Sequence, residues 1–218
     1  MRLTDLSLTE YVDPWTGRRE PVRGAVSPFR EAHGDAFTGA RLYHGTDPIA
    51  AASILLADHL RASIDYSDGT SFATTLISGR GWAERSIREH VMYMLDHVGR
   101  LPEDLGGLPS SRGVVLILDA QKLARDYRLI QYVHPEYGEE GEVRADRPIR
   151  NLHEYLIGLD YDPADMEWFA RCLSLPEVRR DYTNPDRIIA ELHRLGQTRP
   201  LAEAFNPWTA RPGLRKTD

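Results

Sequence analysis

Three short polar segments of the chain carry side chains that could bind a ligand or react with one. Tyr43-His44-Gly45-Thr46 ends a predicted strand, Ser71-Phe72-Ala73-Thr74-Thr75 lies in a second strand, and Glu140-Gly141-Glu142 lies in a polar stretch. Imidazole, hydroxyl and carboxylate groups can hold sugar hydroxyls, accept a proton or stabilise a positive charge. Each segment alone also fits a plain structural role, as a helix cap, a strand edge or a solvated loop. The three segments together are the candidates for a site.

The motifs of several other classes of site are missing from the sequence. It contains no G-x-G-x-x-G or G-x-x-x-x-G-K-[ST] run, so the glycine-rich nucleotide cradles are not predicted, and no G-x-S-x-G marks a serine nucleophile. The eight histidines form no H-E-x-x-H pattern. Cys172 is the single cysteine, which excludes an internal disulfide framework and a cysteine-rich zinc site. We therefore expect no bound metal.

The elements predicted around these segments would position them. Leu42-Tyr43 predicts a short strand, and Asp47-Pro48 supplies a helix cap with proline in the first turn. The pattern then predicts a strand over 69–76, a helix from about Gly81 to Val98, a strand buried on both faces over 113–120 and a polar loop over 135–148. After Asp162 the chain predicts helices. Because strands and helices do not alternate as βαβ units, the expected fold class is α+β.

Length and composition bound the remaining possibilities. The 218 residues are 41% hydrophobic and 28% charged, as expected for a globular protein, and the net charge of −6 argues against nucleic-acid binding through the whole surface. No apolar run approaches the roughly 20 residues that span a bilayer, and the first residues lack the apolar core of a signal peptide. We therefore expect a cytoplasmic protein without a membrane partner.

In order and spacing, the three polar segments resemble the motifs of the ADP-ribosyltransferase superfamily. That family carries His-Gly or Arg on a first strand, Ser-Thr or aromatic-Ser on a second, and Glu-x-Glu at a loop-to-strand junction; here "LYHGT", "TSFATT" and "EEGEVR" occur in that order. The resemblance covers a little over half the chain. It implies a split β-sheet core with flanking helices over residues 41–162. The Pro-, Gly- and Arg-rich composition of residues 1–40 predicts an N-terminal arm, and the pattern after Asp162 predicts a helical C-terminal extension over 163–218 packed on the core.

The resemblance also implies which residues would bind NAD. His44 would hold the adenosine ribose, and the backbone of Gly45 would hold the nicotinamide carboxamide, with glycine required because a side chain would block the ligand. Thr46 would begin the helix turn, and Phe72 would offer a ring face to the nicotinamide. Ser71 would orient the second glutamate. Arg41 and Arg61 are candidates for the pyrophosphate.

Two glutamates would carry the reaction that the resemblance implies. Glu142 would stabilise the positive charge that develops at the ribose as nicotinamide leaves, and it would hold the ribose 2′-hydroxyl. Glu140, turned differently by Gly141, would serve the incoming acceptor.

The implied activity is an NAD-dependent mono-ADP-ribosyltransferase, such as a bacterial or phage toxin or effector. NAD would be its substrate, the acceptor would be a protein or a nucleic acid, and an antitoxin or immunity protein is a possible partner. Phe72 stands where one branch of the family has tyrosine, and the run Ser71-Phe72-Ala73-Thr74 stands where the other has Ser-Thr-Ser. The acceptor class therefore stays open. The alternatives are an RNA 2′-phosphotransferase, a rifamycin-type small-molecule transferase, and an inactive binding module of the same fold.

Overall fold

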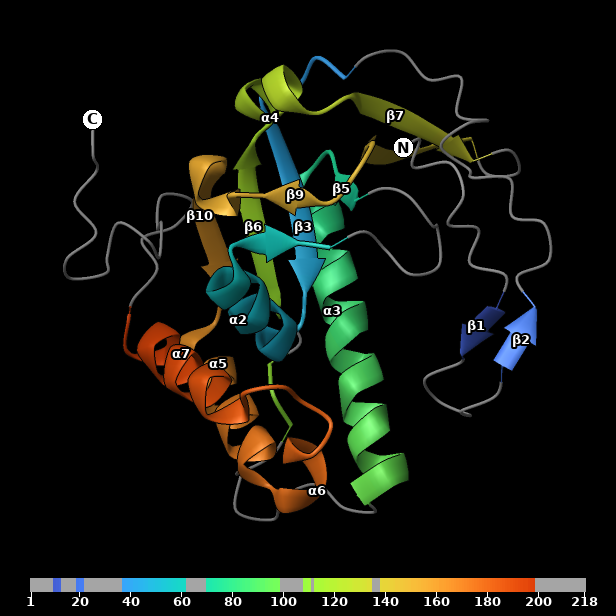
Figure 1. Cartoon of the computed structure of the whole chain (residues 1–218). Coiled ribbons are helices and arrows are strands. Elements are labelled where there is room, and N and C mark those ends of the chain that lie inside the picture. The colour runs from blue at the N-terminus through green and yellow to red at the C-terminus, as the bar shows by residue number, and fades with distance from the viewer. Residues whose placement is uncertain are drawn as a thin grey trace, which may run out of the picture.

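A six-stranded sheet carries all three polar segments, in the strand order β10–β6–β3–β5–β8–β7 (Figure 1). The computed structural model describes residues 10–12, 19–21, 37–61, 70–98, 108–110, 112–134 and 138–198. Each neighbouring pair of strands in this order is antiparallel. The strands are β3 (Arg41–Thr46), β5 (Thr70–Ala73), β6 (Val114–Asp119), β7 (Leu129–His134), β8 (Gly138–Ala145) and β10 (Leu156–Tyr161). The predicted α+β class is therefore confirmed.

The sheet divides between β3 and β5. These two strands share a single registered pair, Tyr43 with Ala73, whereas β3 pairs with β6 over its whole length. One half of the sheet is thus β10–β6–β3, and the other is β5–β8–β7. Since His44 and Gly45 follow directly after Tyr43, the first polar segment lies where the two halves separate.

Side-chain caps set the starts of the helices that flank this division. Asp47 caps α2 (Pro48–Ala57) by accepting a hydrogen bond from the backbone N–H of Ala50, as the sequence predicted. The hydroxyl of Thr75 accepts from Ser78 N–H and starts α3 (Leu76–Tyr93), which continues into a π-helical turn (Met94–Val98). The predicted start at Gly81 was too late and the predicted strand too long, because the two glycines of "SGRG" hid the first turn of the helix.

The polar loop predicted over 135–148 is wrong for residues 138–145, which form β8. Its residues 142–145 pair with β5, and its other edge pairs with β7. Among the side chains of β8 that the structure describes (142–145), Val143 and Ala145 are the buried apolar ones, so the hydrophobic alternation that reveals a strand is too short to detect. The register to β7 shifts between Tyr132 and Val133, so that Glu140 and Gly141 form a bulge. The bulge takes the place of the turn expected at Gly141.

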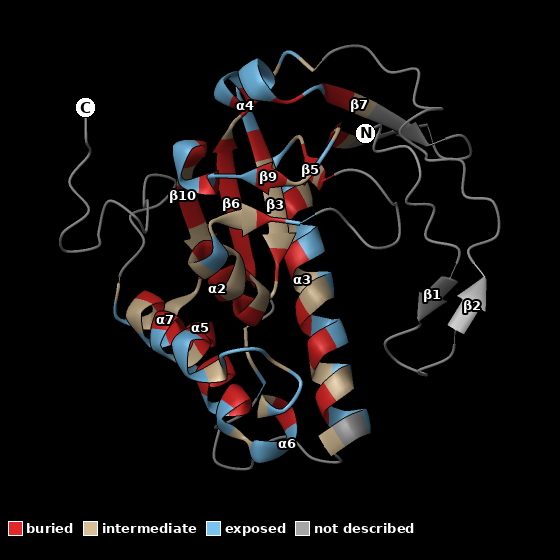
Figure 2. Cartoon of the chain, viewed as in Figure 1, coloured by how far each residue is buried: buried red, intermediate tan, exposed pale blue. Residues whose placement is uncertain are grey.

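Three C-terminal helices pack beside the sheet: α5 (Pro163–Ser174), α6 (Pro176–Arg179) and α7 (Pro185–Gln197). The helices α5 and α7 contact each other and also α2. Their buried side chains join those of the sheet in one hydrophobic cluster, and Figure 2 shows the buried residues along the sheet and the inward faces of these helices. The helical extension predicted from residue 163 therefore shares its core with the sheet, while 199–218 lie outside the described residues.

The remaining elements are small. The strands β1 (Glu10–Val12) and β2 (Arg19–Pro21) pair with each other, and they are the described part of residues 1–36. The strand β4 (His59–Leu60) pairs with β9 (Ile149–Arg150), α4 (Ala120–Asp126) follows β6, and a 3₁₀ turn (Leu152–Glu154) precedes β10. Among the described helices, none combines the length and apolar character needed to cross a bilayer.

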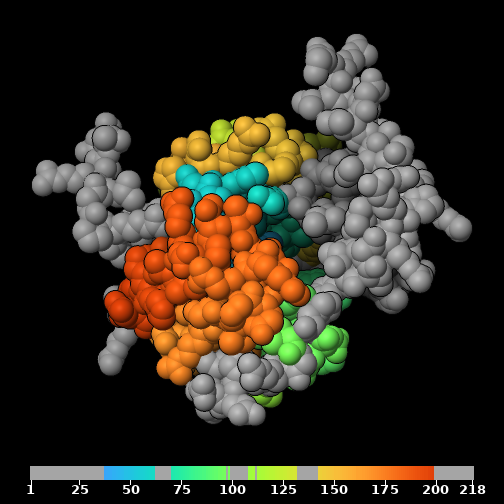
Figure 3. All heavy atoms as spheres, turned by 60° about the horizontal axis from the view of Figure 1, so that its bottom comes forward, coloured from blue at the N-terminus to red at the C-terminus, as the bar shows by residue number. Residues whose placement is uncertain are grey.

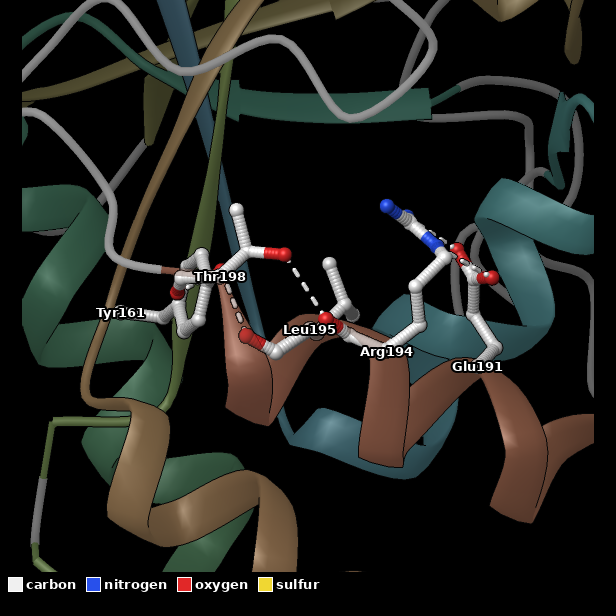
Figure 4. A network of polar contacts seen from close by, with 5 residues as sticks. All are labelled: Tyr161, Glu191, Arg194, Leu195 and Thr198. Carbon is white, nitrogen blue, oxygen red and sulfur yellow. Dashed lines mark hydrogen bonds and ion pairs between the residues drawn. The ribbon is translucent and has the colours of Figure 1, made fainter. Parts of the chain in front are cut away.

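The hydroxyl of Tyr161 on β10 forms hydrogen bonds with the C-terminal end of α7 (Figure 4). The buried Tyr161 of β10 donates a hydrogen bond to the carbonyl of Leu195 at 3.0 Å, with the carbonyl of Thr198 at 3.3 Å. Burial raises the pKa of Tyr161 to about 12, so the hydroxyl remains a donor. On the same helix Arg194 forms a two-point ion pair with Glu191, at 3.0 and 2.7 Å.

Tyr161→Phe is expected to lower the free energy of unfolding by about 1 kcal/mol, because the buried carbonyl of Leu195 and the partly buried carbonyl of Thr198 lose the donor they share. For a chain of this length the midpoint of thermal denaturation should fall by roughly 2–4 °C. Calorimetry measures the shift. An unchanged midpoint would show that the hydroxyl does not hold α7.

Candidate functional site

A pocket of about 930 Å³ opens where the two halves of the sheet separate. Its walls come from α2 and β4, from α3, from the segment 181–188 that leads into α7, and from three strands of the sheet. Figure 3 shows this face of the molecule, with the C-terminal helices in orange, the segment of α2 and β4 in cyan and α3 in green around the hollow. The residues of these three strands that line it are Tyr43, His44 and Gly45 of β3, Thr70, Ser71, Phe72 and Ala73 of β5, and Glu142 and Arg144 of β8.

Six of the nine residues given a role from the sequence therefore line one pocket, namely His44, Gly45, Arg61, Ser71, Phe72 and Glu142. Arg41 and Thr46 do not line it. Arg41 is exposed at the start of β3 beside Asp119, and Thr46 is buried opposite Val114. The backbone of Glu140 belongs to the bulge of β8, and its side chain lies outside the described part of the structure. Arg61, the second candidate for the pyrophosphate, lines the pocket.

The imidazole of His44 bridges the division in the sheet. Its Nδ1 lies 3.1 Å from the carbonyl oxygen of Ser71 on β5. Because a carbonyl oxygen only accepts, Nδ1 carries the proton and Nε2 is an acceptor. Burial lowers the pKa of His44, and the bond to Ser71 opposes this effect only in part, so the ring is neutral at pH 7. The pocket thus contains a fixed, uncharged acceptor suited to a hydroxyl group.

Gly45 lacks a side chain for a different reason from the one expected. A Cβ atom built at this position would lie 1.9 Å from the carbonyl oxygen of Gly79 and 2.7 Å from the backbone nitrogen of Ala83, both in α3. Gly79 is also tightly packed, though less so, since its Cβ would lie 2.9 Å from that of Tyr43. The two glycines therefore allow β3 and α3 to approach closely. The space that a side chain would take at Gly45 is occupied by the helix and not by a ligand.

The ring of Phe72 belongs to the hydrophobic core. Only 2% of its surface is exposed, and it meets His44 edge to face with ring centroids 6.1 Å apart. A stacked nicotinamide would need one accessible ring face, which so buried a ring does not present. Phe72 contributes to the pocket wall by packing against His44, and the stacking role implied by the resemblance lacks support in this arrangement.

Arg144 is the hydrogen-bonding partner of Glu142. Its Nε donates to Oε1 at 2.8 Å and its Nη2 to Oε2 at 3.4 Å. The sequence resemblance assigned the orienting role to Ser71, but the register of β5 and β8 places Ser71 opposite Arg144, and Ala73 opposite Glu142. The sequence could have indicated this partner. Residues i and i+2 share one face of a strand, so recognising 138–145 as a strand would have paired the two side chains.

Other residues of the pocket carried no motif. Trp82 of α3 is half exposed, and the guanidinium of Arg85 lies 5.6 Å from the centre of its ring. The segment from Asp181 to Ile188 forms the wall opposite the sheet. Trp82, a tryptophan among the charged residues of α3, is the sequence signal that could have indicated the α3 wall of the pocket. The segment 181–188 is brought opposite the sheet only by the packing of α5 and α7 on α2.

The described residues include no group of three or more His, Cys, Asp or Glu side chains placed to hold a metal ion. No protein-family model matches the chain, and neither a curated protein nor a solved structure shows significant similarity to it.

The imidazoles of His44, which is partly buried, and His90, which is buried, predict how stability depends on pH. Burial lowers the pKa of both His44 and His90, the latter held in α3 beside Phe169. The unfolded chain, whose histidines titrate near the ordinary value of 6.5, then binds protons more readily than the folded chain. Stability is therefore full above about pH 6.5 and falls as the pH drops from there toward the folded-state values, by at most about 1.4 kcal/mol per pH unit for each histidine.

Urea denaturation of the parent and of His90→Gln at pH 7.5 and 5.5 tests this expectation. The variant should lose less stability than the parent over that interval, since one of the two titrating groups is gone. Equal losses would show that His90 does not titrate differently in the folded and unfolded states.

Proposed function

We propose that the chain is an NAD-dependent ADP-ribosyltransferase whose reaction takes place in the pocket between the two halves of the sheet. The observation that carries the proposal is the meeting of His44, Ser71 and Glu142 around this one pocket, although 98 residues separate the first from the last in sequence. The volume of about 930 Å³ lies in the range of roughly 300–1,000 Å³ usual for small-molecule and cofactor pockets. The division between β3 and β5 also agrees with the split sheet of that superfamily.

The chemistry of these side chains suits cleavage of a nicotinamide–ribose bond. As the C–N bond breaks, its electron pair leaves with nicotinamide, and positive charge develops on the ribose. A carboxylate held in a mostly buried position stabilises that charge more than it would in water, and the side chain of Glu142 is only 14% exposed. The neutral His44 accepts a hydrogen bond from a ribose hydroxyl through Nε2. The acceptor nucleophile then bonds to the ribose carbon and loses a proton.

The acceptor in this proposal is a macromolecule, protein or nucleic acid, as for a toxin or effector. Trp82 of α3 is half exposed where it lines the pocket, with the guanidinium of Arg85 beside its ring, so an aromatic and a cationic group are available to an acceptor larger than a small molecule. Glu140 remains the candidate for receiving the proton of the acceptor, because it precedes Glu142 by two residues on the same strand.

The test is incubation of the purified chain with NAD labelled in its adenosine part, with and without lysate. The proposal expects free nicotinamide in both reactions and label in the protein or nucleic-acid fraction of the second. Nicotinamide with no label transfer would reduce the activity to NAD hydrolysis. Absence of nicotinamide would reject the enzyme, and only NAD binding without nicotinamide release would favour the inactive binding module.

A further inference from the structure

The pair formed by Glu142 and Arg144 is buried at the edge of the pocket. The side chain of Arg144 is 5% exposed and that of Glu142 14%, and both residues line the pocket. The guanidinium approaches with two nitrogens, but unequally, at 2.8 Å to Oε1 and 3.4 Å to Oε2. A guanidinium that donates through two nitrogens fixes the plane of a carboxylate as well as its position.

The strand itself holds Glu142 less regularly than its neighbours. The pairing of β8 with β7 shifts directly before this residue, at the bulge of Glu140 and Gly141. On the other side, the residue opposite Glu142 is Ala73, whose small side chain cannot confine a carboxylate. The guanidinium of Arg144 therefore supplies the constraint that the sheet does not provide at this point.

We propose that Arg144 is the positioning residue of the reaction, acting through Glu142. This inference rests on the proposed function. Arg144 keeps Oε1 in a short, charge-assisted hydrogen bond, and Oε2, the more loosely held oxygen, meets the ribose hydroxyl or the positive charge at the reacting carbon. Each carboxylate oxygen has a second lone pair, so binding the ribose does not require the ion pair to break. Arg144 thus governs the rate of bond cleavage without contacting the reacting atoms.

The test compares Arg144→Lys and Arg144→Met with the parent, by nicotinamide release at saturating and limiting NAD. Lysine keeps the charge but not the two-point geometry, so kcat should fall by about tenfold; methionine keeps neither, and a misplaced carboxylate should cost on the order of 100-fold. The KM for NAD should stay near the parental value. A matched control is Arg194→Met, which removes a similar Arg–Glu pair from α7, outside the pocket, and should leave kcat unchanged.

A double-mutant cycle separates action through Glu142 from other effects. In a Glu142→Gln background, Arg144→Met should cost no further rate, because the group it positions is already absent. A further loss, a rise in KM with unchanged kcat, or a loss matched by Arg194→Met would overturn the inference while leaving the proposed function in place. If the parent itself releases no nicotinamide, the proposed function fails first, and that result is distinct from all three.

Discussion

Glu142→Gln is expected to reduce nicotinamide release from NAD by about 10²–10³-fold, the usual effect of removing one preorganised charge-stabilising group. The amide has nearly the shape of the carboxylate but carries no negative charge for the developing positive centre. In the structure Glu142 forms an ion pair with the buried guanidinium of Arg144, so its charge also affects the stability of the fold. Initial rates at saturating NAD measure the catalytic effect. A Gln variant with the parental rate would remove Glu142 from the site.

The same substitution should lower stability, and this effect must be kept apart from catalysis. Removing one partner of a buried ion pair costs roughly 3–5 kcal/mol, of which the glutamine oxygen recovers a part by accepting from Arg144. The double variant Glu142→Gln with Arg144→Met removes both charges and should recover stability, yet remain inactive. Thermal denaturation of both variants, with rates measured well below the lower midpoint, separates the two effects. Recovery of activity in the double variant would attribute the loss to folding.

Gly45→Val is expected to destabilise the fold by at least about 3 kcal/mol, because its Cβ would overlap the Gly79 carbonyl, 1.9 Å away, in the backbone of α3. The helix must then move away from β3, and the wall of the pocket moves with it. The midpoint of thermal denaturation should fall by roughly 6 °C or more. Weak NAD binding by this variant would follow from the loss of structure and would not by itself show that Gly45 touches NAD.

Gly81→Ala is the control for this prediction. Gly81 lies in α3, the helix that packs against Gly45, and no atom lies within 4 Å of its Cβ position. The substitution should therefore stabilise the chain by about 0.5–1 kcal/mol. A Gly45→Val protein that melts like the parent but no longer binds NAD would reverse the conclusion and return the glycine to a ligand-binding role.

The parts of the fold that the sequence predicts well are those where several local signals agree. The strand β6 is a continuous run of buried aliphatic residues, and α2 begins with an aspartate cap followed by proline. In α5 and α7, a proline in the first turn precedes an apolar face. In the three helices, the proline of the first turn and the hydrophobic pattern indicate the same boundary.

Prediction fails where a tertiary contact replaces those signals. The strand β8 is polar and contains a bulge, so only its pairing with β5 and β7 identifies it. The start of α3 contains glycine because β3 packs closely against it, which weakens the helical pattern at that point. Both elements border the pocket, and in both the secondary structure expected from the local sequence differs from the one observed.

The same distinction applies to the site. The resemblance proposed His44, Ser71 and Glu142, and these three residues line one pocket, on strands that are neighbours or next neighbours in the sheet. Arg144, the partner of Glu142, was missed because residues 138–145 were predicted as a loop. The pairing of Ser71 with Arg144 depends on the register of β5 and β8. Nor could the wall formed by segment 181–188 be predicted, since it depends on how the C-terminal helices pack on α2.

A crystal structure of the wild-type chain with an NAD analogue whose nicotinamide–ribose bond cannot break tests the central claim most directly. The claim is that NAD binds between the two halves of the sheet. The expected result is a nicotinamide ribose within hydrogen-bonding distance of Glu142, with Nε2 of His44 accepting from a ribose hydroxyl and Arg144 still paired with Glu142. An analogue that binds elsewhere, or no binding at millimolar concentration, would contradict the account.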